Sequence, residues 1–112
     1  YMEPKGILPL MRRIAKHYPG KPIFITENGV ADTDDKFRKW WLKETMEALD
    51  AAHKENIPVA GYLHWSLLDN FEWAYGWWPE FGLVSVDRKN GMKRTVRPSA
   101  KWWAQEIKKY EF

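Results

Sequence analysis

Two apolar runs on either side of one amphipathic segment constrain the fold of this chain most. Residues 23–26 read Ile-Phe-Ile-Thr and residues 59–66 are apolar almost throughout, as is typical of parallel strands covered on both faces. Between the runs, apolar residues recur at helical spacing as far as about Glu55. The predicted helix face consists of Phe37, Trp41, Thr45, Leu49 and Ala52. Strand, helix and strand in this order predict a right-handed βαβ unit.

Further helices and a hairpin are predicted on either side of this unit. A first helix begins at Gly6 and ends at the Pro-Gly pair 19–20, and a last helix follows Pro98. Residues 83–86 and 93–96 flank an Asn-Gly pair, which predicts a β-hairpin. The apolar positions at helical spacing are Ile7, Leu10, Met11, Ile14 and Tyr18 in the first helix and Trp103, Ile107 and Tyr110 in the last.

The predicted elements are too few for a finished domain. Two parallel strands and three helices leave the edges of the sheet without partners. We therefore expect an α/β fold in which residues 1–112 form one segment of a larger barrel. The alternative is an independently folded small domain, which would show a cooperative thermal transition in isolation although two strands bury little core.

Composition excludes several classes of protein. The sequence contains no cysteine, which rules out a disulfide framework or a thiolate metal site and fits a reducing or hot environment, so we expect a cytoplasmic protein. No apolar run approaches the ~20 residues of a membrane span. The net charge of +3, with lysine and glutamate interspersed, indicates a solvated surface and no nucleic-acid partner. Eight tryptophans fit either a sugar-binding surface or an aromatic-rich core.

Glu27 occupies the position where α/β folds place their chemistry. It directly follows the run 23–26, and the Asn28-Gly29 pair after it favours the positive φ of a tight turn. The carboxylate is therefore expected at the carboxyl end of a buried parallel strand. A glutamate here can also cap the next turn or pair with a lysine, and from position alone that ordinary interpretation is preferred.

No metal site is predicted. Residues 32–35 read Asp-Thr-Asp-Asp but lack the central glycine and closing glutamate of a calcium loop, so they predict a helix start capped by carboxylates. His17 and His53 have no second ligand four residues on. His64 is interpreted as a hydrogen-bonded strand residue rather than a base.

The segment after the second run carries a specific motif. Residues 65–73 read Trp-Ser-Leu-Leu-Asp-Asn-Phe-Glu-Trp, and together with Ile-Thr-Glu-Asn-Gly at 25–29 this resembles glycoside hydrolase family 1, the β-glucosidase and β-glycosidase family. His64 before Trp65 resembles the thermophilic archaeal branch. Shorter matches extend the resemblance over essentially the whole chain: residues 1–7, Asp35 with Arg38, residues 81–83 with Val86-Asp87, and Arg-Pro-Ser-Ala at 97–100.

The resemblance implies a (β/α)8 TIM barrel, with this chain as helix 6, strand 7, helix 7, strand 8, a β-hairpin and helix 8. It implies that Glu27 is the nucleophile of a retaining mechanism that forms a covalent glycosyl-enzyme. Retention also needs an acid/base carboxyl roughly 5–5.5 Å from the nucleophile. The family's acid/base lies in a Thr-x-Asn-Glu-Pro motif that this sequence lacks, so a complementary N-terminal fragment is expected to supply it. No cofactor is implied, because two carboxylates suffice.

The resemblance also assigns four substrate-binding residues. Glu72 would accept hydrogen bonds from hydroxyls of the non-reducing sugar, and Trp73 would donate its indole N–H to a neighbouring hydroxyl. Trp65 would be the platform beneath the sugar ring, and Phe81 would border the hydroxymethyl group. Taken singly, each has an ordinary alternative as a core aromatic or an exposed loop residue. Asn28 is expected to hold the strand end of the nucleophile.

Other positions are expected to be structural, or depart from the family pattern. Asp69 and Asn70 are expected to tie the irregular loop through side-chain hydrogen bonds. Glu80 stands where the family has arginine, and Thr45 where it usually has histidine. Two pairs of tryptophans also depart from the pattern: Trp40 and Trp41, and Trp77 and Trp78. Because of Trp77 and Trp78, the resemblance does not assign the residues that contact the leaving group.

Two functions follow as alternatives. The first is hydrolysis of terminal β-D-glycosidic bonds, of β-glucoside or β-galactoside type, once the complementary fragment completes the barrel. The second is a non-catalytic sugar-binding or assembly piece, which predicts sugar binding without turnover and survival of function in a Glu27→Gln variant. Alone, the chain would expose strand edges and an aromatic-rich face and is expected to associate or aggregate.

Overall fold

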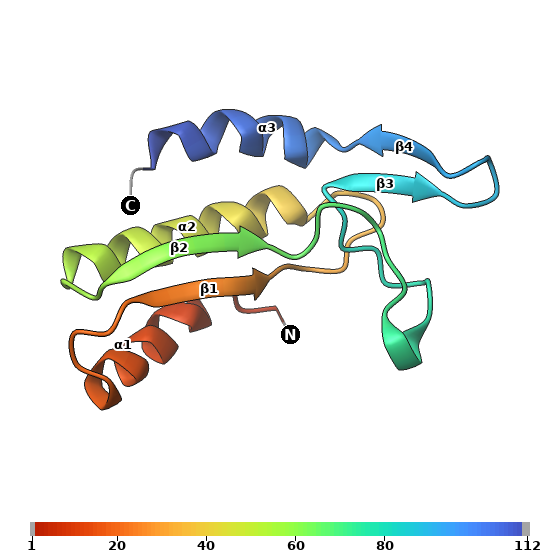
Figure 1. Ribbon diagram of the computed structural model, residues 1–112. Helices are drawn as coiled ribbons and strands as arrows, with labels where there is room; N and C mark the ends of the chain where they lie inside the picture. The colour runs from red at the N-terminus through yellow and green to blue at the C-terminus, as the bar shows by residue number, and fades with distance from the viewer. Residues whose placement is uncertain (1, 111–112) are drawn as a thin grey trace.

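The computed structural model describes residues 2–110; Tyr1, part of the motif at 1–7, and residues 111–112 lie outside the described residues. Helices and strands follow one another in the predicted order (Figure 1). The helices are α1 (Ile7–His17), α2 (Arg38–Lys54) and α3 (Pro98–Glu106), and the strands are β1 (Ile23–Asn28), β2 (Val59–His64), β3 (Val84–Asp87) and β4 (Lys93–Val96). Short 3₁₀ helices are η1 (Pro4–Gly6), η2 (Trp73–Tyr75) and η3 (Ile107–Lys109).

β1 and β2 form a parallel pair connected through α2, so the predicted βαβ unit is confirmed. Ile23 lies opposite Val59 and Ile25 lies opposite Tyr62, but the register is irregular both between these pairs and between Ile25 and Asn28. Such β-bulges bend a strand and re-aim the side chains that follow them. The second irregularity falls on the stretch that carries Glu27.

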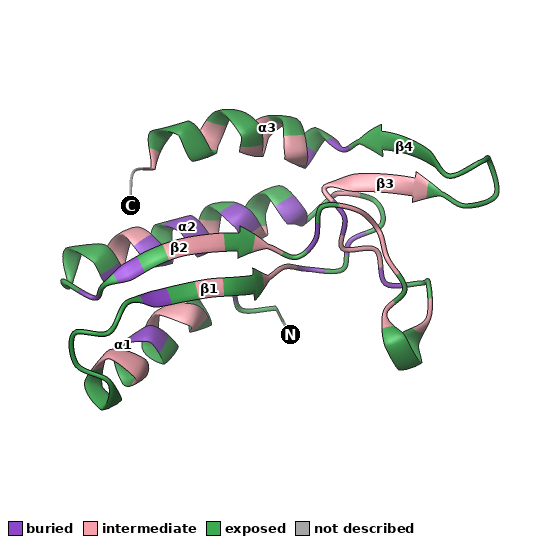
Figure 2. Cartoon of the chain, viewed as in Figure 1, coloured by how far each residue is buried: buried purple, intermediate pink, exposed green. Residues whose placement is uncertain are grey.

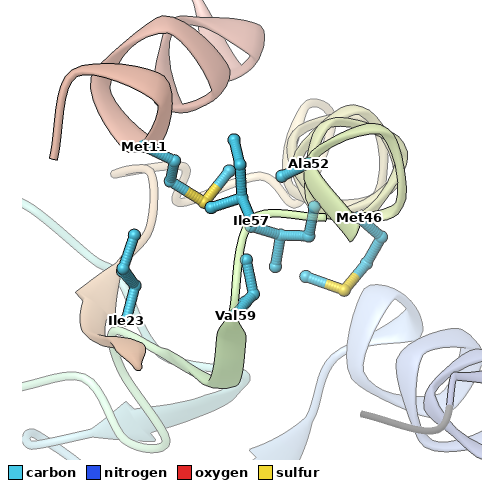
Figure 3. Close-up of a cluster of buried hydrophobic side chains, with 7 residues drawn as sticks. Met11, Ile23, Met46, Ala52, Ile57 and Val59 are labelled. Carbon is cyan, nitrogen blue, oxygen red and sulfur yellow. The ribbon is translucent and has the colours of Figure 1, made fainter. Parts of the chain in front are cut away.

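The core lies between the sheet and the helices α1 and α2 (Figure 3). Its members are apolar side chains from both helices, both strands and the residue before Pro58: Met11, Ile23, Met46, Leu49, Ala52, Ile57 and Val59. Burying a side chain of valine, isoleucine or methionine size stabilises the folded state by roughly 1.5–3 kcal/mol. Thr45, Leu49 and Ala52 are buried on α2, as predicted.

Four residues predicted on apolar helix faces are exposed instead, and one of them, Ile107, is 43 % exposed just after α3 ends at Glu106. Phe37 is 49 % exposed because α2 begins only at Arg38. Tyr18 is 64 % exposed because it leaves the helix as the C-cap of α1, with φ −128°. Leu10 is 54 % exposed, whereas its neighbour Met11 is 1 % exposed in the core. A single narrow stripe of α1 therefore contacts the rest of the chain.

One side of this architecture is open. Ile23 and Val59, the first residues of β1 and β2, are buried, whereas every later residue of both strands is intermediate or exposed (Figure 2). Phe24 is 53 % exposed and Leu63 is 54 % exposed. Among residues 2–110, neither strand pairs with a third. The described chain also contains no helix long and apolar enough to cross a membrane.

β3 and β4 form the predicted antiparallel hairpin, which is attached to the end of β2. β2 ends at His64, two residues earlier than predicted, because the backbone from Ser66 onward bonds to the segment before the hairpin. The Ser66 N–H donates to the Phe81 carbonyl at 3.3 Å, and the Leu83 N–H donates to the Ser66 carbonyl at 2.9 Å. These bonds place the long loop 67–82 beside the carboxyl ends of β1 and β2.

Candidate active site

Glu27 lies near the carboxyl end of β1, and the irregular register decides which way it faces. Three steps along β1, from Ile25 to Asn28, match two steps along β2. Ile25 packs against the core and Asn28 bonds to Trp41 of α2, so both side chains face the helices. Because neighbours on a strand alternate, Glu27 faces away from the helices, and it is exposed. Its carboxylate forms no hydrogen bond or ion pair with the described residues.

Asn28 ties this strand end to the helix layer and to β2. Its Oδ1 accepts a hydrogen bond from Trp41 Nε1 at 2.9 Å and another from the Tyr62 hydroxyl at 3.1 Å. Its backbone carbonyl accepts the Trp65 N–H at 2.9 Å. These contacts agree with the expected role of Asn28 in holding the strand end.

Gly29 allows the two strand ends to approach closely. A Cβ atom at this position would lie 1.7 Å from the carbonyl oxygen of Trp65 and 3.3 Å from Cε1 of His64. Only glycine fits where one backbone comes this near another. The contact holds the segment that carries Glu27 against the start of the loop that carries Trp65.

Two of the predicted substrate residues, Trp65 and Glu72, contact each other directly. Trp65 Nε1 donates to Glu72 Oε1 at 3.0 Å, and Asn70 Nδ2 donates to the same oxygen at 2.6 Å. Ser66 Oγ bonds to Asn70 Oδ1 at 3.2 Å, which confirms a structural role for Asn70. Glu72 Oε2 accepts no hydrogen bond from the described side chains. An indole face beside a carboxylate with a free oxygen suits the ring and hydroxyls of a sugar.

The other two predicted substrate residues are held less tightly. Trp73 begins η2 with a positive φ of 50° and is 87 % exposed. Phe81 is half-buried, and its carbonyl accepts the Ser66 N–H. Of the four predicted substrate residues, Trp65 and Glu72 are thus bonded to each other, and Phe81 is bonded through its carbonyl to Ser66. The Trp73 ring has no hydrogen bond or ring contact to residues 2–110.

Asp69 anchors the loop, as predicted, but through an arginine that the sequence interpretation did not identify. Asp69 Oδ1 accepts the Gly82 N–H at 2.8 Å and Arg97 Nη1 at 2.9 Å. Arg97 is 6 % exposed and also donates to Glu80 Oε2 at 2.7 Å. Glu80, which departs from the family pattern, is thus part of this ion-pair network. Only the Arg-Pro-Ser-Ala match drew attention to residue 97, because its partners lie 17 and 28 residues away in sequence.

Arg38 forms a second buried anchor at the start of α2. It is 0 % exposed, and its Nη2 donates to the carbonyls of Asp32 at 2.8 Å and Glu80 at 2.9 Å. Its Nη1 donates to Asp35, which also accepts the N–H and the hydroxyl of Ser99. Burial raises the pKa of Asp35, but the bonds from Ser99 and Arg38 outweigh it and hold that pKa below its usual value. Asp32 Oδ2 accepts the Arg38 N–H at 2.9 Å, so the predicted carboxylate cap is confirmed, but α2 begins at Arg38 rather than at residues 32–35 as predicted.

His64 is a partly buried, neutral strand residue. Burial lowers the pKa of His64 to about 4; the nearby Arg38 charge adds to this, and the Phe81 backbone opposes it. Nδ1 lies 3.5 Å from the Tyr62 hydroxyl, and the buried Nε2 has no well-formed hydrogen bond within the described chain. A base with so low a pKa is weak, in agreement with its interpretation as a structural residue. No group of three His, Cys, Asp or Glu side chains within residues 2–110 forms a metal site.

Of the two pairs of tryptophans that depart from the family pattern, Trp40 and Trp41 lie on α2, and Trp77 and Trp78 lie on an exposed aromatic loop, residues 71–78. Tyr75 contacts Trp78 edge-on, with ring centroids 6.2 Å apart, and Trp78 is 69 % exposed. The Arg88 guanidinium lies 4.3 Å from the centroid of the Trp77 ring, close enough for a cation–π interaction. This loop carries Glu72, so both tryptophans lie near the residues proposed to bind sugar.

Comparison with known proteins agrees with this geometry. A family model described as glycosyl hydrolase family 1 matches residues 1–112. Beta-glucosidase 42 of Arabidopsis thaliana is 40 % identical, with 96 % of this chain and 24 % of the relative covered. The 4-hydroxy-7-methoxy-3-oxo-3,4-dihydro-2H-1,4-benzoxazin-2-yl glucoside beta-D-glucosidase 1a of Triticum aestivum is 41 % identical, with 94 % of this chain and 20 % of the relative covered.

Solved structures show the same similarity. The β-glycosidase of the hyperthermophile Thermosphaera aggregans is 45 % identical with a TM-score of 0.87, over 94 % of this chain and 21 % of that chain. The AHE enzyme of Alicyclobacillus herbarius is 30 % identical with a TM-score of 0.91, over 97 % of this chain and 26 % of that chain. The chain thus spans only 20 % to 26 % of the length of these relatives. It belongs to glycosyl hydrolase family 1.

Proposed function

We propose that this chain is the carboxyl-terminal part of a retaining β-glycosidase that hydrolyses terminal β-D-glycosidic bonds, of β-glucoside or β-galactoside type. Glu27 is the nucleophile in this proposal. The observation that carries it is the end of β1, where an extra residue turns Glu27 to the open face while Asn28 and Gly29 are held in place. Trp65 directly follows the neighbouring strand β2, and it bonds to Glu72 of the long loop.

The chemistry follows from a carboxylate at this position. Glu27 attacks the anomeric carbon, and the bond from that carbon to the leaving oxygen breaks. The leaving oxygen takes a proton from the acid/base carboxyl, which then removes a proton from the water that releases the sugar with retained configuration. Trp65 lies under the sugar ring, Glu72 accepts its hydroxyls, and Trp73 and Phe81 border it. The reaction requires no cofactor because two carboxylates suffice.

The second carboxyl belongs to a segment that this chain does not contain. We assign α1, β1, α2, β2 and α3 to helix 6, strand 7, helix 7, strand 8 and helix 8 of a (β/α)8 barrel, which needs about 200 residues or more. The free edges of β1 and β2 and the exposed Phe24 and Leu63 support this assignment, because strands 1 to 6 would cover them. A complementary N-terminal segment would then supply those strands and the acid/base glutamate.

The test uses a completed barrel, in which this chain replaces the matching 21 % of the Thermosphaera aggregans β-glycosidase. The protein is incubated with a 2-deoxy-2-fluoro glycoside, which traps glycosyl-enzymes, and its intact mass and labelled peptide are determined. We expect one added sugar, attached to Glu27. The matched Glu27→Gln variant should remain unlabelled and lose hydrolysis by on the order of 10³-fold or more. Turnover without any label on Glu27 would contradict the proposal.

The exposed aromatic loop 71–78 favours a second candidate, a sugar-binding piece without catalysis. In that case the completed barrel would bind glycosides without turnover, and Glu27→Gln would bind them equally well. Titration calorimetry of both proteins with a β-glucoside, beside the labelling experiment, separates the two functions. A calorimetric scan of the isolated chain tests the independent-domain alternative, for which we expect no cooperative transition.

A further inference from the structure

The side of the strand end opposite Glu27 carries a polar cluster that the proposed mechanism does not use. Asn28 Oδ1 accepts hydrogen bonds from Trp41 Nε1 at 2.9 Å and from the Tyr62 hydroxyl at 3.1 Å. Both lone pairs of the amide oxygen are therefore occupied. The Tyr62 hydroxyl also lies 3.2 Å from the Asn28 carbonyl, and burial raises the pKa of this tyrosine, so the hydroxyl keeps its proton and donates.

Trp41 is the member of this cluster that comes from outside the sheet. Tyr62 lies on β2 and moves with the strand pair, whereas Trp41 lies on α2. Three other side chains of α2 are almost fully buried, at 0 %, 1 % and 0 % exposure: Leu42, Met46 and Leu49. A helix packed so closely is a rigid reference, so the bond from Trp41 fixes Asn28 relative to the core.

The strand end needs such a bond because its ladder is interrupted. The extra residue between Ile25 and Asn28 leaves part of β1 without regular pairing to β2. An interrupted strand end rotates more easily than a regular one, and a rotation of the backbone at Asn28 would turn its immediate neighbour Glu27 with it. Glu27 itself has no hydrogen bond or ion pair to the described residues that would resist this rotation.

We propose that Trp41 is a positioning residue, whose indole N–H acts through Asn28 to fix the direction in which the Glu27 carboxylate leaves the strand. This inference rests on the proposed function. Trp41 forms no hydrogen bond or ring contact with the substrate residues Trp65 and Glu72 in the described chain, so we expect its loss to slow the attack more than it weakens binding. Misplacing a reacting atom by about 1 Å can cost up to ~100-fold in rate.

The test compares variants of the completed barrel by kcat, KM and the rate of labelling at Glu27. Trp41→Phe removes the donor and keeps an aromatic ring, and we expect kcat and the labelling rate to fall about tenfold with KM changed less than about twofold. Trp41→Tyr restores a donor and should recover most of the loss. The matched control is Trp40→Phe, because Trp40 contacts Trp41 edge-on at 6.5 Å but has no hydrogen bond to the strand within the described chain.

The outcomes separate this inference from the proposed function. A completed barrel that turns over without label on Glu27 overturns the proposed function, and this inference with it. Labelling at Glu27 with equal kcat in the parent, Trp41→Phe and Trp40→Phe overturns this inference alone. So does a loss in Trp41→Phe that Trp41→Tyr fails to reverse, because it indicates packing rather than donation. If Trp41→Phe does not fold, Tyr62→Phe removes the second donor to Asn28 and is judged by the same split between kcat and KM.

Discussion

Two regions at the carboxyl ends of β1 and β2 differ in how far their side chains are buried. The region behind the strand ends holds the buried anchors Arg38 and Arg97, and the region in front of them is the exposed aromatic loop 71–78. Behind them, Arg38 is 0 % exposed and Arg97 is 6 % exposed, and each bonds to carboxylates and to backbone carbonyls. In front, Trp73 and Trp78 are 87 % and 69 % exposed. The buried arginines therefore hold the backbone of the candidate site in place. The exposed aromatic residues of the loop, by contrast, contribute little to the stability of the fold.

The largest expected effect comes from removing a buried anchor. Arg97→Met in the completed barrel leaves Asp69 nearly buried without its ion-pair partner, since the Asp69 side chain is 10 % exposed. Breaking a buried pair in this way costs about 3–5 kcal/mol, measured as the free energy of unfolding in guanidinium chloride. The control is Arg94→Met on β4, where the side chain is exposed and forms no ion pair to the described residues, and a change within about 0.5 kcal/mol is expected. If Arg97→Met and Arg94→Met lost equal unfolding free energy, Arg97 would not be an anchor of the fold.

The next largest effect concerns the contact between the strand ends. Gly29→Ala places a methyl group 1.7 Å from the Trp65 carbonyl oxygen, so one backbone must move. We expect a loss of about 3 kcal/mol in unfolding free energy, together with slower labelling of Glu27. Gly91→Ala separates this clash from backbone strain, because Gly91 has φ 60° but open space around its missing Cβ, and it should cost only about 1–2 kcal/mol. A smaller loss in Gly29→Ala than in Gly91→Ala would show that the strand ends separate easily.

A smaller, pH-dependent effect is expected from His64, which lies between the two regions. Its folded-state pKa of about 4 lies below the ordinary value of 6.5, so the unfolded chain binds the proton more readily. The contribution of neutral His64 is thus complete above pH 6.5 and is lost as the pH falls toward 4. Unfolding free energies measured across this range should decline less steeply in His64→Gln. Identical slopes in the two proteins would mean that His64 is not buried as described.

The elements of the fold follow from local patterns, and the anchors of the site do not. Continuous apolar runs and helical spacing predict β1, α2 and β2, and an Asn-Gly pair predicts the hairpin, because each depends on neighbours in sequence. The same patterns misplace Phe37 by one residue at the start of α2 and assign Leu10 to a buried face. Those errors arise where the end of a helix or the width of its contact depends on what packs against it.

Contacts between distant residues explain the rest of what the sequence does not reveal. Arg38 bonds to the carbonyl of Glu80, 42 residues away, and Ser99 bonds to Asp35, 64 residues away. The bulge before Asn28 is equally hidden, because it depends on the register between two strands rather than on the composition of one. Family resemblance drew attention to Asp35, Arg38 and residues 97–100 without indicating that they bond across the chain.

The smallest effect on stability is expected in front of the strand ends. Trp78→Ala in the completed barrel removes a ring that is 69 % exposed and contacts Tyr75 edge-on at 6.2 Å, so the unfolding free energy should change by no more than about 0.5 kcal/mol. Because the ring lies on the loop that carries Glu72, hydrolysis should instead become less sensitive to the size of an apolar leaving group, measured as kcat/KM for a series of aryl and alkyl β-glucosides. Trp78→Ala could instead lose as much unfolding free energy as Arg97→Met, with kcat/KM unchanged across the leaving-group series. That result would mean that the aromatic loop supports the fold, and that exposure does not separate the residues that stabilise the fold from those that contact the substrate.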